Sequence, residues 1–84
     1  MATVKIRYWA GAKAAAGTAA EEVEATTPRQ ALAAVGRLRN DPSFDRVIGA
    51  CSILIDGRAA HEADLDRPVS GVVELELLPP FAGG

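Results

Sequence analysis

Hydrophobic and polar residues alternate in two short stretches, one near each end of the chain. Residues 3–9, TVKIRYW, place on one face Val4, Ile6 and Tyr8, and on the other face Lys5, Arg7 and Trp9. Residues 72–78, VVELELL, repeat the pattern, with Val73, Leu75 and Leu77 on one face and Glu74 and Glu76 on the other. Alternation with a period of two is typical of a strand that buries one face. Both stretches are therefore predicted to be half-buried strands.

Between these strands, residues 26–40, TTPRQALAAVGRLRN, carry the signals of a helix start. Thr27 is a favourable N-cap, Pro28 suits the first helical position, and Gln30 stands three residues after the cap, as in a capping box. Apolar residues then recur at helical spacing, namely Ala31, Leu32, Val35 and Leu38. The sequence predicts one main helix, which ends at Asn40-Asp41-Pro42 because proline cannot continue it.

The segments on either side of this helix give weaker signals. The alanine content of residues 10–17, AGAKAAAG, allows a helical turn, but the short length of the stretch and its bounding glycines favour a loop. Residues 18–24, TAAEEVE, are predicted to form a second strand, with Val23 as its main apolar residue. After the helix, residues 43–49, SFDRVIG, are expected to be a short turn that returns Phe44 and Val47 or Ile48 to the core.

A hairpin is predicted in the second half of the chain. Residues 51–55, CSILI, read as a buried strand, and Asp56-Gly57 is a strong signal for a tight turn. Residues 58–60, RAA, are then expected to begin the return strand. The polar stretch at 61–68 and a turn at Ser70-Gly71 lead into the last strand.

The order of these elements is strand, strand, helix, strand, strand fragment, strand, without an internal repeat. Two hairpins separated by one helix predict an α+β protein with a ubiquitin-like β-grasp, in which the main helix packs across a mixed sheet and the first and last strands are central, adjacent and parallel. That pairing sets Lys5 and Arg7 opposite Glu74 and Glu76. It also puts Trp9 and Leu78 on the outer face. The alternative is a one-residue slip of the first strand, which would bury Trp9 with Lys5 and Arg7.

Length and charge exclude several classes of protein. A chain of 84 residues forms one domain with a small core. Its net charge of −2, from interspersed acidic and basic residues, offers no basic face for nucleic acid. No apolar run approaches the roughly 18 residues of a membrane span. The start of the chain leads directly into a strand pattern, and the single Cys51 has no disulfide partner, so an unprocessed cytoplasmic protein is expected.

The final segment, LLPPFAGG at 77–84, combines stiff and flexible residues. Pro79 and Pro80 fix φ and lack amide hydrogens, so the strand ladder stops there. Gly83 and Gly84 lack Cβ, which lets the backbone approach the walls of a narrow cleft closely. We therefore divide the chain into a domain at 1–78 and a flexible C-terminal Gly-Gly tail at 79–84, with Phe81 and Ala82 in its middle.

A terminal glycine offers an unhindered carboxylate as a possible reactive group. A carboxylate is a poor electrophile because it has no leaving group, so acyl or sulfur transfer requires activation, for example as an acyl-adenylate. The chain brings no general base of its own to this chemistry. We therefore expect it to act as a carrier and not as an enzyme by itself, with the catalytic groups on its partners.

The whole chain resembles the β-grasp sulfur-carrier proteins, and most closely the small subunit of molybdopterin synthase, with the carriers of thiamine synthesis as relatives. The resemblance rests on the element order, the opening strand VKIRYWA, the helix start TPRQAL, the turn ILIDG and, above all, the terminus LLPPFAGG. A terminal Gly-Gly alone is a weak signal. Pro-Pro-x-x-Gly-Gly after an apolar strand in so short a chain is much more specific.

The resemblance implies a reaction sequence and a set of partners. An E1-like adenylating enzyme would use ATP to adenylate Gly84, and a sulfur donor would displace AMP to leave a thiocarboxylate. The large subunit of molybdopterin synthase would then accept the tail, and the sulfur would pass to a pterin precursor in molybdenum cofactor biosynthesis. The chain itself is expected to bind no cofactor and no metal. Trp9, Leu78 and, by resemblance, Ala59 are expected to form an apolar partner-binding patch.

Three alternatives remain open at the level of the sequence. The first is a carrier for another sulfur pathway, such as thiamine or cysteine synthesis. The second is a ubiquitin-like modifier, whose Gly84 forms an isopeptide bond with lysines of other proteins. The third alternative is a binding module with an inert tail, which predicts normal function after deletion of the last two residues.

Overall fold

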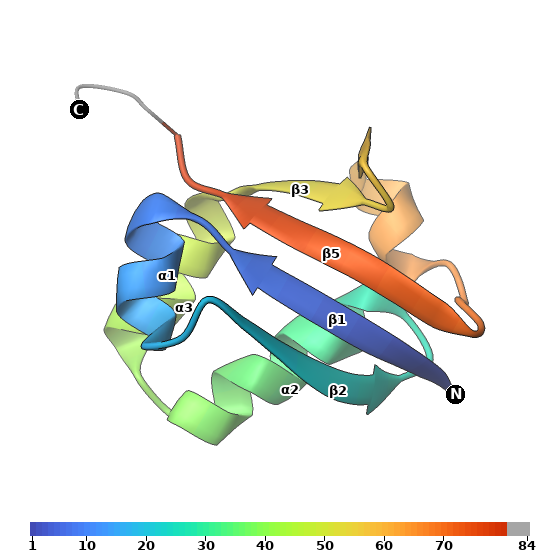
Figure 1. The fold of residues 1–84 in the computed structure, drawn as a ribbon, viewed down its shortest axis with the longest axis horizontal. Helices are drawn as coiled ribbons and strands as arrows, with labels where there is room; N and C mark the ends of the chain where they lie inside the picture. Colours follow the sequence, from blue (N-terminus) through green and yellow to red (C-terminus); the bar gives the residue numbers. More distant parts are fainter. Residues whose placement is uncertain (81–84) are drawn as a thin grey trace.

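The chain folds into a mixed sheet with helices packed on one face (Figure 1). The structure is a computed structural model and describes residues 1–80. The strand order is β2-β1-β5-β3-β4, and the two strands β1 (Ala2–Tyr8) and β5 (Val72–Leu78) run parallel in the interior of the sheet. The predicted α+β fold, a β-grasp with adjacent first and last strands, is confirmed.

The alternation of both predicted strands is confirmed by their burial. Val4, Ile6 and Tyr8 are at most 1% exposed, and the same face continues into β5 through Leu75 and Leu77. Trp9, on the opposite face, is 43% exposed. The first strand therefore has the predicted register, since a slip by one residue would exchange the two faces.

The second strand lies at one edge of the sheet. It spans Ala20–Ala25, slightly later in the chain than predicted, and pairs antiparallel with β1 as β2. Val23 is the direct partner of Val4 and is half-buried against the core. The hairpin between β1 and β2 contains a helix that the sequence pattern did not predict.

That helix, α1 (Ala10–Ala16), corrects the prediction of a loop at 10–17. Five of its seven residues are alanine, which has the highest helix propensity, and Ala12 is fully buried. Gly17 ends the helix in the left-handed conformation, with φ 77°, and its N–H bonds to the Lys13 carbonyl. The glycine that suggested a loop is thus a helix C-cap.

The main helix, α2 (Pro28–Arg39), begins as predicted. The Thr27 hydroxyl oxygen accepts a hydrogen bond from the Gln30 N–H at 3.2 Å. The Gln30 side chain accepts in return from the N–H of Thr26 at 3.0 Å, one residue before the cap. The two bonds satisfy one free amide group of the first helical turn and the amide of the residue before the cap.

The apolar face of α2 differs from the predicted one at its last turn. Pro28, Ala31 and Val35 are buried, whereas Leu38 is 71% exposed. The half-buried residue at this end is Arg39, whose guanidinium carbon lies 4.6 Å from the Phe44 ring centroid and 5.5 Å from that of Tyr8. Arg39 also pairs with Glu21 at 2.7 Å and donates to the Ala16 carbonyl at 3.2 Å. One side chain thereby joins α1, α2 and β2.

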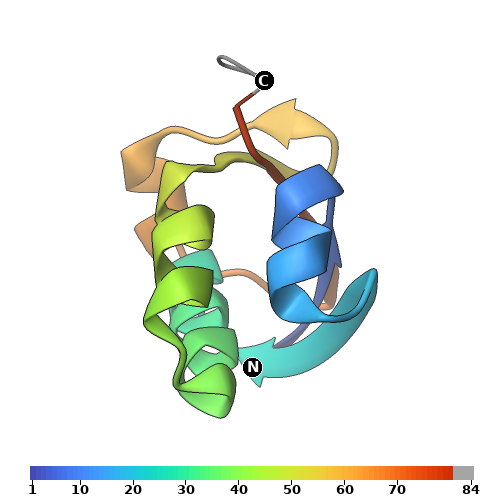
Figure 2. The same ribbon diagram turned by 90° about the vertical axis from the view of Figure 1, so that its left-hand side faces the viewer.

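A third helix, α3 (Pro42–Ala50), replaces the predicted short turn at 43–49. Asp41 caps it by accepting from the Ser43 N–H at 2.9 Å, and Pro42 occupies its first turn. Phe44 does reach the core, as predicted, and α3 lies beside α1 (Figure 2). Within residues 1–80, none of the helices has the length and apolar character needed to cross a membrane.

The predicted hairpin is present at the other side of the sheet. Strand β3 (Ser52–Ile55) pairs with the short β4 (Arg58–Ala59) and, on its other side, with β5. Asp56 and Gly57 have φ values of 49° and 83°, the pair of left-handed residues that a tight type I′ turn requires.

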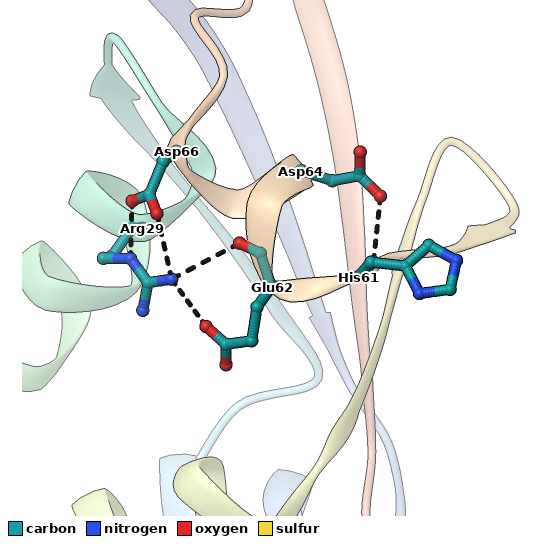
Figure 3. A network of polar contacts seen from close by, with 5 residues as sticks. All are labelled: Arg29, His61, Glu62, Asp64 and Asp66. Carbon is teal, nitrogen blue, oxygen red and sulfur yellow. Dashed lines mark hydrogen bonds and ion pairs between the residues drawn. The ribbon is translucent and has the colours of Figure 1, made fainter.

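The polar stretch at 61–68 contains a short 3-10 helix, η1 (Glu62–Asp66), that is tied to α2 (Figure 3). Arg29 bonds to Asp66 at 2.6 Å and to Glu62 at 2.8 Å, and Asp64 accepts from the His61 N–H at 2.9 Å. The hydrogen bond from Arg29 lowers the pKa of the Asp66 carboxyl. Because these groups are exposed, the pairs fix the position of η1 more than they add stability.

Candidate partner-docking site at the end of the last strand

The two central strands end together at one edge of the sheet. Tyr8 in β1 is the Cα partner of Leu77 in β5, and the N–H of Trp9 donates to the Leu77 carbonyl at 3.2 Å. Figure 1 shows the arrowheads of β1 and β5 side by side. Parallel pairing of β1 with β5 therefore brings Trp9 next to the strand that precedes the predicted tail.

Trp9 is held by its side chain as well as by its backbone. Its indole Nε1–H donates to a carboxylate oxygen of Glu76 at 3.1 Å. The guanidinium carbon of Arg7 lies 5.7 Å from the centroid of the ring, which is within the range of a cation–π contact. The ring is thus exposed and oriented at the same time.

The other predicted site residues near Trp9 are at the end of β5 and in the segment that follows it. Leu78 and Pro79 are half-buried, and Pro80 is exposed. Strand β5 ends at Leu78, since Pro79 and Pro80 have no N–H to continue the ladder. Phe81, Ala82, Gly83 and Gly84, which the sequence assigns to the tail, lie outside the described residues.

Ala59 lies on the same outer face, farther across the sheet. The direct cross-strand partners form a row from Arg7 through Glu76 and Leu54 to Ala59. Because neighbouring strands are about 4.8 Å apart, Ala59 stands roughly 10 Å from Glu76. Ala59 is exposed, and the half-buried Leu54 fills the position between them.

Leu54 is a site candidate that the sequence analysis missed. The sequence predicts a buried strand at residues 51–55, yet Ile53 and Ile55 pack against the core while Leu54 is on the outer face, opposite Glu76. The available signal was the pairing with β5, because partners across a sheet point to the same side. Four apolar residues of this outer face, Trp9, Leu54, Ala59 and Leu78, are together called the docking face. Val72, which is 64% exposed, lies on the same face at the other end of β5 and is not part of it.

The charged residues of the outer face are aligned but not paired as ions. Lys5 is the Cα partner of Glu74 and Arg7 that of Glu76, as predicted. Within residues 1–80, however, the ion pairs are made by Arg29, Arg39 and Arg67. The Glu76 carboxylate instead accepts the indole hydrogen bond of Trp9.

Cys51 has the properties of a packing residue. Its thiol is half-buried and donates to the Val47 carbonyl at 3.3 Å, and burial raises its pKa. A thiol with a raised pKa carries little thiolate and is a weak nucleophile. In the described part of the chain, His, Cys, Asp and Glu side chains form no group of three or more that could hold a metal ion.

Solved structures with the same fold extend over nearly the whole chain. The small archaeal modifier protein 1 of Methanosarcina acetivorans has a TM-score of 0.82 and 26% identity, over 100% of this chain and 98% of its own. The protein of the same name from Haloferax volcanii has a TM-score of 0.78 and 26% identity, over 98% of this chain and 99% of its own.

A third neighbour comes from a protein complex. It belongs to the complex of subunits 1 and 2 of the molybdopterin-converting factor of Helicobacter pylori, with a TM-score of 0.68 and 22% identity, over 98% of this chain and 99% of that chain. No protein-family model and no curated protein matches the chain. The chain therefore has the fold of ubiquitin-like β-grasp proteins, and the solved structures similar to it include small archaeal modifier proteins and a chain of a molybdopterin-converting factor.

Proposed function

We propose that the chain is a sulfur carrier that serves as the small subunit of a molybdopterin synthase, with Gly84 as the residue that carries the sulfur. The observation that supports this proposal is the end of β5. This strand lies in the interior of the sheet and stops at Leu78, close to the exposed Trp9, and the sequence after it reads PPFAGG. A rigid strand followed by prolines and glycines suits a segment that enters a partner's active site.

The chemistry follows from the need to activate a carboxylate. Attack of the Gly84 carboxylate on ATP forms an acyl-adenylate and releases pyrophosphate. The terminal sulfur of a persulfide donor then attacks the acyl carbon and AMP leaves, which gives an acyl disulfide. A thiol attacks the donor's sulfur in this S–S bond, so that the thiocarboxylate leaves and the thiol and the donor are joined in a disulfide. When the thiocarboxylate sulfur has bonded to an acceptor, water attacks the acyl carbon, the acceptor leaves with the sulfur, and the carboxylate is restored. The chain binds no cofactor in this scheme, and ATP is used by the adenylating partner.

The second partner in this proposal is the large subunit, which would accept the tail and hold the pterin precursor. The neighbour from Helicobacter pylori supports a two-subunit assembly, since that structure contains subunit 1 with subunit 2. The matched chain there is as short as this one, because the alignment covers nearly all of both.

Intact-mass analysis of the protein purified with its partners tests the proposal. We expect a species heavier than the chain by the mass difference between sulfur and oxygen, located by fragmentation at Gly84. The matched control is a variant that lacks Gly83 and Gly84. Absence of the heavier species from the wild-type protein, in the presence of ATP, an adenylating enzyme and a sulfur donor, would contradict the proposal.

A second candidate function is protein modification, and the solved neighbours favour it specifically. The two small archaeal modifier proteins have higher identity and TM-scores than the converting-factor chain. Adenylation of Gly84 is common to both candidates, and they differ in the acceptor. Lysine-linked conjugates of the wild-type chain in cell extract, lost when Gly83 and Gly84 are deleted, would favour the modifier.

A further inference from the structure

Trp9 is constrained more tightly than an exposed side chain normally is. Two hydrogen bonds tie it to β5, one from its backbone N–H to Leu77 at 3.2 Å and one from its indole to Glu76 at 3.1 Å. The next residue, Ala10, has a φ of 47°, a left-handed conformation that is unfavourable for alanine. The chain thus turns sharply into α1 directly after Trp9, and the ring stays over the end of β5.

Glu76 has an alternative partner that it does not use. Arg7 is its direct neighbour across the parallel pair, and the guanidinium could form an ion pair there. In the structure the carboxylate accepts from the indole, and the Arg7 guanidinium lies 5.7 Å from the centroid of the Trp9 ring. A hydrogen bond to an ionised carboxylate is stronger than one between neutral groups, so it can hold a ring that little else covers.

The position of the docking face restricts which partner can reach it. From Pro80 to Gly84 the chain spans at most about 14 Å when fully extended. An enzyme that binds Gly84 in its active site must therefore lie against this end of the sheet. Since Trp9 is hydrogen-bonded to both Glu76 and Leu77 at the end of strand β5, it is within that contact area.

We infer that Glu76 is a positioning residue, which presets the Trp9 indole for docking to the adenylating enzyme. The inference rests on the proposed function and names the residue that prepares its docking face. Ordering a side chain before binding removes an entropic cost from association. The partner surface that fits is an apolar pocket for the indole, with an acidic group near Arg7 and a basic group near Glu76.

The test compares three variants, Glu76→Ala, Glu76→Gln and Glu74→Ala. Glu76→Ala removes the acceptor, whereas Glu76→Gln removes the charge and keeps an amide oxygen that can accept the indole bond. Glu74→Ala is the matched control, because it removes the same charge from the same strand and face without touching Trp9. The probe is the E1-like adenylating enzyme of the source organism, assayed by ATP–pyrophosphate exchange.

The first readout is the fluorescence anisotropy decay of Trp9, the one tryptophan in the chain. We expect faster ring motion in Glu76→Ala, and motion like that of the wild type in Glu76→Gln and Glu74→Ala. The second readout is adenylation kinetics. We expect KM to rise about threefold to tenfold in Glu76→Ala with kcat unchanged, and Glu76→Gln to restore most of the loss.

Two results would overturn the inference while the proposed function stands. One is ring motion and KM in Glu76→Ala equal to those of Glu74→Ala. The other is a freer ring with an unchanged KM, since orientation of the indole would then not matter for docking. Failure of the wild-type chain to form an adenylate at Gly84 is a different outcome. It contradicts the proposed function and the docking role together.

Discussion

Tyr8 shows how a single residue can make the fold sensitive to pH. It is the one tyrosine of the chain, it is 1% exposed, and its hydroxyl donates to the Glu21 carboxylate. Burial, and then the hydrogen bond with Glu21, raise its pKa above the usual value of about 10. The folded state therefore keeps the phenol proton at pH values where the unfolded chain loses it.

We predict that stability falls as pH rises above about 10, because only the unfolded state releases the Tyr8 proton there. Below that pH the contribution is fully present. Ultraviolet titration should show the phenolate appearing together with unfolding. Tyr8→Phe is the control, and its free energy of unfolding should depend less steeply on pH in this range. Equal slopes for the two proteins would contradict the prediction.

Trp9 and Leu75 are expected to contribute to different properties, Trp9 to partner binding and Leu75 to stability. Trp9 is 43% exposed, whereas Leu75 is fully buried. We predict that Trp9→Ala weakens binding to the adenylating enzyme by about 2 kcal/mol or more at little cost in stability. Leu75→Ala, a core truncation, should lower the free energy of unfolding by about 2–5 kcal/mol.

Calorimetric binding and chemical denaturation separate these two effects. Leu38→Ala is a matched control for Trp9→Ala, because Leu38 is 71% exposed but lies on α2. It should bind the partner normally. If Trp9→Ala binds as well as Leu38→Ala, the docking face is not where the partner binds.

At the scale of elements, α1 depends on its neighbours. It is seven residues long, and its packing side chains are alanines, so it buries little apolar area of its own. Its C-terminal end is held by Arg39, which donates to the Ala16 carbonyl through two nitrogens, each at 3.2 Å. The same guanidinium contacts the rings of Tyr8 and Phe44 and pairs with Glu21.

We predict that Arg39→Ala lowers the free energy of unfolding by about 2–3 kcal/mol, because it removes ring contacts and leaves partly buried acceptors without a donor. Arg39→Lys should lose less, as it keeps the charge but not the planar fork. Urea denaturation measures both. Arg37→Ala, on the exposed side of the same helix, is the control. A loss no larger than that of Arg37→Ala would show that the Arg39 contacts contribute nothing measurable.

The contrast between buried and exposed residues in each element explains which elements could be predicted from the sequence. The alternation of β1 and β5 was clear, because one face of each is buried and the other is charged. Alanine gives no such contrast, so the pattern of residues 10–17 favours a loop, although Gly17 marks the end of helix α1. The start of α3 carries a cap and a proline, Asp41-Pro42, like those of α2 at Thr27-Pro28, but the same two residues also mark the end of α2.

The docking face was partly predictable for a related reason. The exposure of Trp9 and the position of Leu78 followed from alternation within one strand each. Leu54 and the bond between Trp9 and Glu76 depend on which strands are neighbours and in what register. The pattern of apolar and polar residues within one segment does not show which strand will be its neighbour or in what register the two will pair.

At the scale of the whole molecule, the proposed carrier role depends on distance. The domain ends at the docking face, and at most about 14 Å of extended chain separates Pro80 from Gly84. The adenylating site must therefore receive the terminal carboxylate at a position set by contacts on the sheet. In such a carrier, the contacts of the docking face determine where the terminal carboxylate can reach.

We predict that adding one glycine after Gly84 abolishes activation and leaves the fold intact. The added residue moves the reacting carboxylate out of line with the α-phosphate, and a misplacement of about 1 Å can cost on the order of a hundredfold in rate. Circular dichroism should be unchanged, since the addition lies beyond β5. One glycine added before Met1, which is 87% exposed, is the control and should be activated normally. Adenylation of the C-terminally extended chain at the wild-type rate, with mass spectrometry showing no trimming, would mean that the terminal carboxylate of Gly84 is not the reacting group.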